Sequence, residues 1–211
     1  MLRSLTTLIA CVAVAAIASG CGSSTGSSSG SPSRAGSRSS AGVGSTPGAG
    51  ALSAEATSAA TGDIPDNQAF LTYRNPAGHY TMSYPEGWAI KARGGEVTIT
   101  DKNNIVHVVV ASAGTPSVAA LNAELTRLAR SNPTLKFSHP TGIQLASGPA
   151  IKTTYSTRSA PNPVTGKSVL LVVDRFELGS AGRRATVDLG TPKGVDNVDA
   201  YRKMISSFRW L

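Results

Sequence analysis

The chain has 211 residues, of which 40% are hydrophobic, 5% aromatic and 15% charged, with a formal net charge of +8. Its two cysteines, Cys11 and Cys21, both lie near the N-terminus, which excludes a disulfide framework and a cysteine-based zinc site from the rest of the chain. The remaining length suffices for one domain with its own hydrophobic core.

The N-terminus has the features of a secretory signal peptide. Arg3 supplies the positive charge, and Leu5 to Ala18 form an apolar run of 14 residues. This run is too short to cross a bilayer as a helix, and it has the length of a signal-peptide core. We therefore predict a signal peptide over residues 1–20.

Cys21 is the predicted lipid attachment site. The segment Ala18-Ser19-Gly20-Cys21 resembles the lipobox of bacterial lipoproteins, although that motif prefers Leu where this chain has Ala18. Lipidation explains the one cysteine that would otherwise be left unpaired in an exported chain. The segment Ala16-Ile17-Ala18 also fits the A-x-A rule of ordinary secretion, so a secreted form without a lipid is the alternative.

Residues 21–62 are predicted to form a disordered linker. They consist mainly of Ser, Gly, Ala and Thr and contain almost no large apolar side chain. Such a segment buries too little surface to offset the entropy lost on ordering. Its root-mean-square reach is roughly 35 Å, from about 5–6 Å times the square root of its length. The linker would hold a globular domain, residues 63–211, away from the membrane.

The first predicted strand of the domain covers residues 80–84, where apolar and polar residues alternate. Pro85 has no N–H to donate and ends the pairing, and Gly87 permits the positive φ of the following turn. Trp88 is then expected to fill the core. A second interpretation is an exposed ligand platform made by Tyr80, Tyr84 and Trp88.

Further strands are predicted from segments that are alternating or continuously apolar. They cover residues 96–100, 105–111, short pieces within 134–144, 149–157, 167–178 and 184–190. Hairpin connections are expected at residues 101–104, 159–166 and 179–182. Segment 105–111 is apolar on both faces apart from His107, which favours a central strand covered on each side.

Two helices are predicted. The first has Thr115 as N-cap and Pro116 as its first residue, and it ends at Asn132-Pro133. The second is capped by Asp196 or Asn197. Their apolar stripes are Val118, Leu121, Leu125 and Leu128 in the first, and Val198, Tyr201, Ile205 and Phe208 in the second. Together these elements predict an α+β fold, a three-layer α/β/α sandwich around an antiparallel sheet.

Two segments carry a family resemblance. Residues 73–80 (YRNPAGHY) and 83–88 (SYPEGW) resemble the opening of PsbP/Mog1-type domains, and residues 201–210 (YRKMISSFRW) are similar to their closing segment. With the lipobox and linker, the chain resembles actinobacterial lipoproteins of the LpqN/LpqT type. The resemblance covers residues 70–211. It implies an antiparallel α/β/α sandwich that usually has no catalytic residues.

The sequence contains no recognised catalytic or metal-binding motif of the Walker, G-x-S-x-G, H-E-x-x-H or EF-hand type. His79, His107 and His139 are scattered, and no metal site is predicted from them. Asp174 interrupts an apolar strand, and we expect it to form an ion pair with a neighbouring Arg or to lie at a strand end. No second carboxylate is placed beside it for acid–base catalysis. We therefore predict no catalytic residue, no metal and no cofactor, and we do not predict an enzyme.

The charge of the domain indicates its class of partner. From residue 64 onward there are 17 Lys and Arg and 10 Asp and Glu, a net charge of +7. This balance favours anionic envelope polymers or headgroups, whereas the extracytoplasmic address and the absence of a basic run disfavour nucleic acid. Arg183 and Arg184 belong to the basic residues that could form a patch. The candidate binding residues are thus Tyr80, Tyr84, Trp88, Arg183 and Arg184.

These features predict an extracytoplasmic lipoprotein, anchored to the membrane through the lipid on Cys21. Its domain is expected to act as a non-enzymatic binding or accessory module for an envelope component or a partner protein. The alternative is a carrier of lipid or envelope glycolipid. A cavity lined by Tyr80, Met82, Tyr84 and Trp88 would support carriage, and a filled core there would count against it.

Overall fold

The computed structural model describes residues 62–161 and 166–211. The predicted signal peptide, Cys21 and the predicted linker up to residue 61 lie outside the described residues, as do residues 162–165 of the predicted connection at 159–166. Within the described ranges, no helix is long and apolar enough to cross a membrane.

Eleven strands and two helices form in this part of the chain. The strands are β1 (Phe70–Asn75), β2 (Tyr80–Pro85), β3 (Ala89–Arg93), β4 (Glu96–Asp101), β5 (Asn104–Ser112), β6 (Lys136–Phe137), β7 (Thr141–Leu145), β8 (Gly148–Arg158), β9 (Leu170–Ser180), β10 (Arg183–Pro192) and β11 (Arg209–Trp210). The helices are α2 (Val118–Ser131) and α3 (Val198–Ser206).

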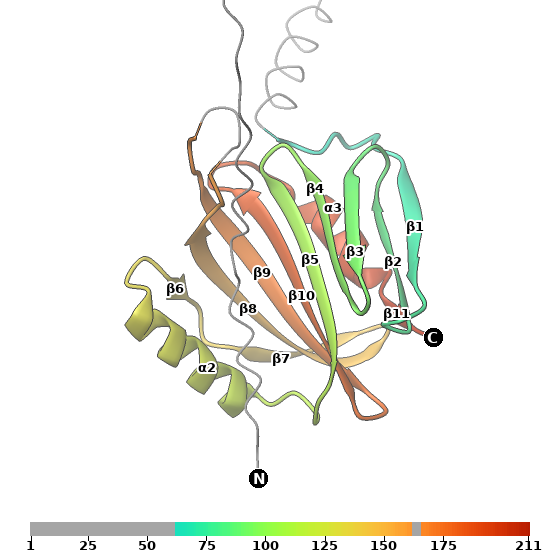
Figure 1. The fold of residues 1–211 in the computed structure, drawn as a ribbon, viewed down its shortest axis with the longest axis vertical. Helices are drawn as coiled ribbons and strands as arrows, with labels where there is room; N and C mark the ends of the chain where they lie inside the picture. Colours follow the sequence, from blue (N-terminus) through green and yellow to red (C-terminus); the bar gives the residue numbers. More distant parts are fainter. Residues whose placement is uncertain (1–61, 162–165) are drawn as a thin grey trace, which may run out of the picture. The chain divides into compact units, whose positions relative to one another are not determined.

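The described strands form two antiparallel sheets (Figure 1). The larger sheet has eight strands in the order β3-β4-β5-β10-β9-β8-β6, and β7 also pairs with β8. The smaller sheet has the order β1-β2-β11, so it joins the beginning of the domain to its end.

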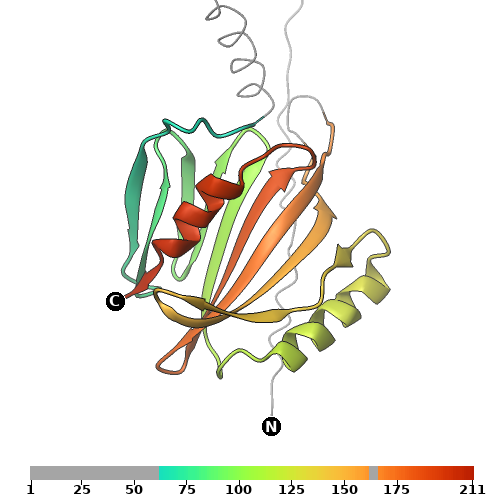
Figure 2. The same ribbon diagram turned by 180° about the vertical axis from the view of Figure 1, so that it is seen from behind.

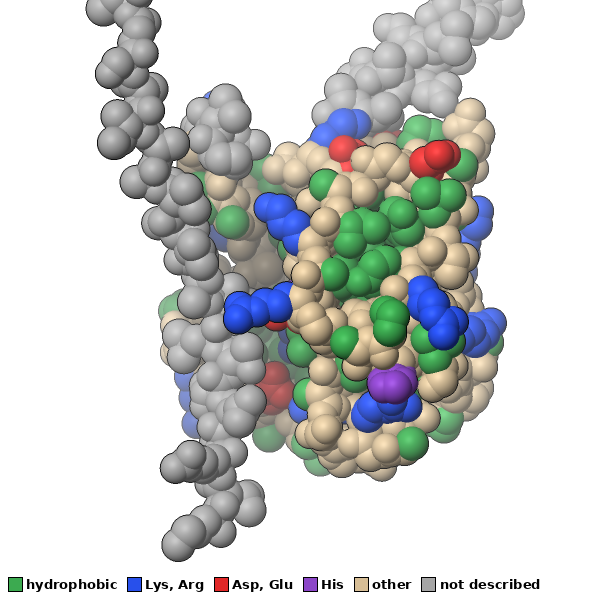
Figure 3. Space-filling view, turned by 45° about the vertical axis from the view of Figure 1, so that its right-hand side comes forward, with side chains coloured by type: hydrophobic (Ala, Val, Ile, Leu, Met, Phe, Trp, Pro, Cys, Tyr) green, Lys and Arg blue, Asp and Glu red, His purple; other side chains and the backbone are tan. Residues whose placement is uncertain are grey.

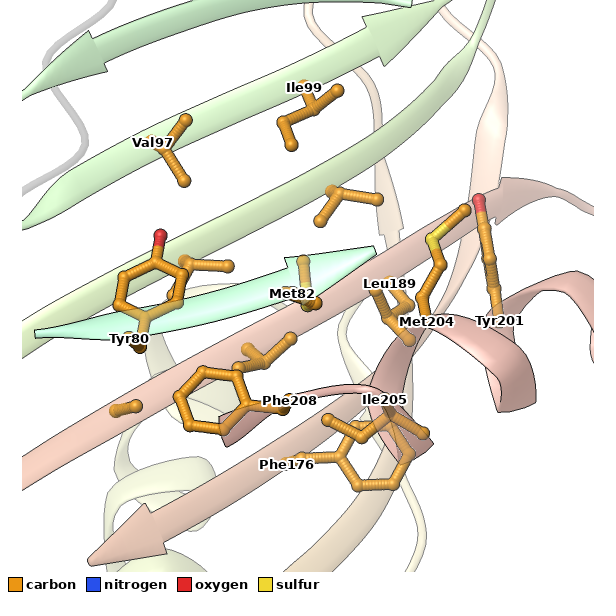
Figure 4. Close-up of a cluster of buried hydrophobic side chains, with 14 of the residues drawn as sticks. Tyr80, Met82, Val97, Ile99, Phe176, Leu189, Tyr201, Met204, Ile205 and Phe208 are labelled. Carbon is orange, nitrogen blue, oxygen red and sulfur yellow. The ribbon is translucent and has the colours of Figure 1, made fainter. Parts of the chain in front are cut away.

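The main core lies where α3 crosses one face of the large sheet (Figure 2). Tyr80 and Met82 of β2 are fully buried together with Phe208, which follows α3. The rings of Tyr80 and Phe208 stack with 5.2 Å between their centroids and an interplanar angle of 12°. Tyr201 and Met204 of α3 complete this side of the core (Figure 4). Burial of these large side chains is the main stabilising contribution in this region.

Helix α2 packs on the other face of the large sheet. Leu121 and Leu125 of α2 form a separate cluster with Ile151 of β8, whereas the adjacent Ala150 belongs to the core beneath α3. Because successive residues of a strand point to opposite faces, the two helices lie on opposite faces of the sheet. The predicted α+β fold, with helices on either side of an antiparallel sheet, is confirmed.

Three short strands, β1, β3 and β11, were not predicted from the sequence. Residues 80–84 are not the first strand of the domain, because β1 precedes them and pairs along its whole length with β2. Strand β3 is exposed at every residue, and β11 has only two residues. None of the three shows a clean alternation of apolar and polar residues, which was the signal used to predict strands.

The prediction that β5 is covered on both faces is wrong. Val106 and Val108 are fully buried beneath the main core, but Ile105, His107 and Val109 on the other face are only half-buried. Helix α2 packs over β8 instead. On its second face β5 is therefore only half-buried.

Both predicted helices are present, with corrections at their starts. The N-cap of α2 is Ser117 and not Thr115, since the Ser117 hydroxyl accepts a hydrogen bond of 3.2 Å from the Ala120 N–H. Asn197 holds the N-cap position of α3, but its side chain makes no capping hydrogen bond, and the Val198 N–H donates to Asp196 Oδ1 at 3.2 Å instead. Val198 is 60% exposed, so the buried stripe of α3 begins at Tyr201.

Three predicted turns are confirmed by their backbone. Lys102 in the β4–β5 hairpin has a φ of 53°, and Ala181 and Gly182 in the β9–β10 hairpin have φ values of 47° and 74°. Gly87, after Pro85, has a φ of 88°. Positive φ in tight hairpins matches the twist of the flanking strands.

Asn197 anchors the first described residues to the rest of the fold. Its buried side chain accepts a 2.8 Å hydrogen bond from the Ile64 N–H. Its amide donates to the Gly62 carbonyl at 3.2 Å, to Asn104 Oδ1 at 3.0 Å and to Thr191 Oγ1 at 2.8 Å. One amide thus links four chain segments at the point where the domain begins.

We predict that Asn197→Asp lowers the free energy of unfolding by about 1–3 kcal/mol, because the buried acceptors on Gly62, Asn104 and Thr191 lose their donor. Burial of the new carboxylate adds to this cost. Urea unfolding followed by circular dichroism measures the change. Asn67→Asp, at an exposed position, is the matched control and should shift the free energy by no more than about 0.5 kcal/mol. Equal effects of the two substitutions would refute the anchoring role.

Candidate ligand-binding site

The face of the large sheet opposite α3 carries a buried ion pair between neighbouring strands. Arg175 of β9 donates two hydrogen bonds of 2.8 Å to the two carboxylate oxygens of Asp188 on β10. Its guanidinium also lies 3.7 Å from Glu124 of α2 and 5.2 Å from the ring centroid of Tyr155. The Arg175 and Asp188 side chains are 16% and 9% exposed. A two-point pair of this kind is rigid, and it links the sheet to α2.

Glu177 lies on the same face, two residues further along β9. It is 4% exposed, and Oε1 accepts a 2.9 Å hydrogen bond from the Thr186 hydroxyl. Oε2 accepts no hydrogen bond from the described residues, and its nearest cation is Arg184 Nε at 3.5 Å. Burial raises the pKa of the Glu177 carboxyl, and this effect outweighs the opposing influence of Thr186 and the nearby arginines.

A cavity of about 500 Å³ opens beside Glu177. We call it the Glu177 cavity. It lies between the segment leading into α2 and the sheet, and its wall is largely apolar. The apolar lining residues are Pro116, Val118, Ile143, Pro149, Ala150 and Ile151. Its volume is in the range of small-molecule sites, which are typically apolar with a few polar groups.

Strand register explains why the hollow forms at this place. Gly142 of β7 pairs with Ile151 of β8, which pairs with Glu177 of β9, so the three residues form one row across the sheet. A Cβ atom on Gly142 would meet nothing within 4 Å. The absence of a side chain at Gly142 therefore leaves open space at the β7 end of this row, and Glu177 lines the same cavity from β9, on the other side of Ile151.

Gly179 fixes the opposite wall. A Cβ atom there would lie 2.7 Å from Pro116 Cδ, so only glycine allows the segment before α2 to approach β9 this closely. Thr115 and Pro116, predicted as the helix start, thus line the cavity. Position 179 has no room for a larger side chain, whereas position 142 has.

The predicted aromatic residues do not lie at this cavity. Tyr80 is fully buried against Phe208 (Figure 4). Trp88 is 8% exposed. Tyr84 is half-buried and its ring contacts Tyr73. Tyr80 and Trp88 therefore fill the core and form no exposed platform, and the core around Tyr80 and Met82 is packed.

Arg183 and Arg184 point to opposite faces of β10 and do not form a joint patch. Arg183 lies over the Trp210 ring, 5.6 Å from its centroid, on the side of the main core. Arg184 lies on the other face, next to Glu177. Of the predicted binding residues, only Arg184 is near the Glu177 cavity. The Glu177 carboxylate itself was missed, although its charge within the apolar segment 167–178 was a signal like that of Asp174.

Asp174 forms the predicted ion pair, but its partner is a lysine and not an arginine. Its carboxylate forms an ion pair of 2.8 Å with Lys152 and accepts a 2.6 Å hydrogen bond from Thr154. Of the three histidines, His107 lies 3.0 Å from Glu96. Within residues 62–161 and 166–211, no group of three or more His, Cys, Asp or Glu is arranged to hold a metal ion.

Two other surface features stand apart from this site. Figure 3 shows hydrophobic side chains gathered on the face of the domain where β1, β2 and β3 lie. Leu71 of β1 and Ile90 of β3 are 44% and 38% exposed. A cavity of about 670 Å³ lies beside α3 and the first described residues. It is lined by Asp66, Asp199 and Lys203 among others, and Lys203 lies 4.1 Å from the ring centroid of Phe70.

No protein-family model and no curated protein sequence matches the chain. Solved structures do match it. PsbP from Synechocystis is 12% identical, with a TM-score of 0.47, and the match covers 71% of this chain and 98% of PsbP. The Ran-binding protein Mog1p from Saccharomyces cerevisiae is 10% identical, with a TM-score of 0.46, and the match covers 68% of this chain and 96% of Mog1p. LpqN, involved in cell envelope biogenesis of Mycobacterium tuberculosis, is 12% identical, with a TM-score of 0.40, and the match covers 68% of this chain and 91% of LpqN. The domain therefore resembles PsbP, Mog1p and LpqN in its fold, and at these identities and TM-scores the resemblance extends to no role or partner.

We predict that Asp188→Ala lowers the free energy of unfolding by about 3–5 kcal/mol, because it leaves the guanidinium of Arg175 buried without its main partner. Chemical denaturation at neutral pH measures the loss. Asp199→Ala is the matched control: Asp199 and Arg202 also form a 2.7 Å pair, but their side chains are 84% and 68% exposed. An exposed pair contributes at most about 1 kcal/mol. A loss as small as the control's would contradict the structural role of the Arg175–Asp188 pair.

Proposed function

We propose that the chain is an extracytoplasmic lipoprotein, held at the membrane by a lipid on Cys21, whose domain is a non-enzymatic binding module for an envelope component. The observation that carries the proposal is the Glu177 cavity, an apolar hollow with a buried carboxylate in its wall. Apolar surface with one charged group provides affinity and orientation for a ligand.

The surroundings of Glu177 favour binding over catalysis. The cations nearest to it are the guanidinium groups of Arg184 and Arg175. These groups stay protonated at ordinary pH and therefore do not act as a general acid or base. Asp188 is held by two hydrogen bonds from Arg175. The other two carboxylates near Glu177 among the described residues, Asp188 and Glu124, both interact with Arg175, which favours a binding role over acid–base chemistry.

The size of the cavity sets the kind of ligand. A volume of about 500 Å³ suits a small molecule or one side chain of a larger partner. The packed core around Tyr80 and Met82 removes the support for lipid carriage at that place. We therefore propose recognition of a short chemical group, presented by an envelope component within reach of the tethered domain.

The binding role predicts that envelope material perturbs the residues of the Glu177 cavity. In ¹H–¹⁵N spectra of the mature chain, soluble envelope fragments from the producing bacterium should shift the amide signals of Gly142, Ile151 and Gly179. Gly142→Leu fills the cavity where space is free and should abolish these shifts. Ala92→Leu, on the exposed edge strand β3, is the matched control and should preserve them. Shifts that survive Gly142→Leu would place the binding elsewhere.

The anchoring role predicts that Cys21→Ser moves the protein from the membrane fraction to the extracytoplasmic soluble fraction. It should also abolish labelling by an alkyne fatty acid fed to the cells, because the acyl chains supply the membrane affinity. Cys11→Ser, in the predicted signal peptide, is the control and should keep both properties. Continued sedimentation of Cys21→Ser with membranes would show that lipidation is not the anchor.

A further inference from the structure

The Glu177 cavity contains an unused acceptor. Oε2 of Glu177 accepts no hydrogen bond from the described residues, although Glu177 is 4% exposed and its other oxygen is bonded to Thr186. A buried polar atom left without a partner is costly, and most such atoms in proteins are satisfied. Glu177 lines the cavity, but Oε2 itself is buried and lies 3.5 Å from Arg184 Nε, so a donor on a bound ligand reaches this oxygen when the Arg184 side chain turns aside.

We infer that the Glu177 cavity binds an ammonium group carried on an apolar stem, an inference that rests on the proposed binding role of the domain. The ammonium N–H donates to Glu177 Oε2. The stem lies against apolar lining residues such as Val118, Ile143 and Ile151. A lysine side chain and a short alkylamine share this chemistry, since both place an ammonium at the end of a methylene chain.

The charges facing Glu177 favour a cation. Glu177, Asp188 and Glu124 stand against two arginines, and Arg175 is held by Asp188 and Glu124. Arg184 is the remaining cation, and it lies 3.5 Å from Oε2 with a side chain 37% exposed, so it can turn to solvent when a ligand arrives. An anion would be repelled by the Glu177 carboxylate, and a neutral donor could not replace the contact with Arg184 that a ligand cation replaces.

The positive charge of the whole domain does not oppose this inference. Charges at the surface are screened over about 8–10 Å at physiological ionic strength, while a charge in direct contact with a buried carboxylate is screened much less. The dispersed basic residues can therefore favour approach to an anionic envelope, and Glu177 decides which group enters the cavity.

The test is calorimetric titration of the mature chain at pH 7 with hexylammonium, hexanol and hexanoate, which share the stem and differ in the terminal group. Hexylammonium should bind at least tenfold more tightly than either of the others. Glu177→Gln should weaken it at least tenfold. Asp174→Asn removes a carboxylate from the opposite face of β9 and should change the affinity for hexylammonium by less than twofold. Glu177→Gln should remain folded, because burial already favours a neutral group at this position, as the raised pKa of the carboxyl indicates.

Three outcomes overturn the inference: hexanoate or hexanol binding as tightly as hexylammonium, no loss with Glu177→Gln, or full binding by the cavity-filling variant Gly142→Leu. The last variant keeps the test decisive if Glu177→Gln does not fold. Shifts at the cavity with envelope fragments but not with hexylammonium would refute the ligand chemistry and leave the binding role standing. Absence of both would refute both. A further arm with N-acetyl-lysine amide distinguishes the source: tighter binding than hexylammonium assigns the cavity to peptide lysines, and weaker binding assigns it to free amines.

Discussion

A single constraint shapes the side of the domain that concerns function: an eight-stranded sheet has two faces, and one 14-residue helix is present on the second. The first face is covered by α3 and the small sheet and holds the main core. On the second face α2 packs on β8 and contacts β9, so β5 is half-buried there, while β9 and β10 carry buried polar side chains. Polar side chains in such a position must be paired with each other, and Arg175 and Asp188 satisfy this requirement across two strands.

The same constraint produces the cavity. The chain leaves β5, passes close to β9 and enters α2, and this passage needs glycine at position 179 because Pro116 occupies the space of a Cβ atom. Gly142 leaves open space at the β7 end of the same row, and Glu177 is the charged residue of that row that lines the cavity. The segment before α2 packs closely on β9 at the same point of the sheet where the Glu177 carboxylate is buried. This combination is the physical basis for a ligand site.

Local features of the sequence predicted most of the fold, while the site depends on pairing between distant residues. Turns such as 101–104 and 179–182 follow from the chemistry of a few adjacent residues, and they were predicted correctly. Asp174 and Glu177 look alike in the sequence, as charges within one apolar strand. Their environments differ because their side chains point to opposite faces, Asp174 toward Lys152 and Glu177 toward the cavity. Register with β8 and β10, which no local pattern specifies, decides between them.

The two sides of the cavity differ in how firmly they are held. The sheet side belongs to strands fixed by the main core, in which Tyr80, Phe208 and Leu189 are almost fully excluded from solvent. The helix side is held by the small cluster of Leu121, Leu125 and Ile151 and by the contact between Glu124 and Arg175. Segments with few buried contacts open at lower free energy than the core. Entry of a ligand beside Glu177 can therefore be accommodated by a shift of α2 without disturbing the main core, which separates the stability of the domain from the adaptability of its candidate site.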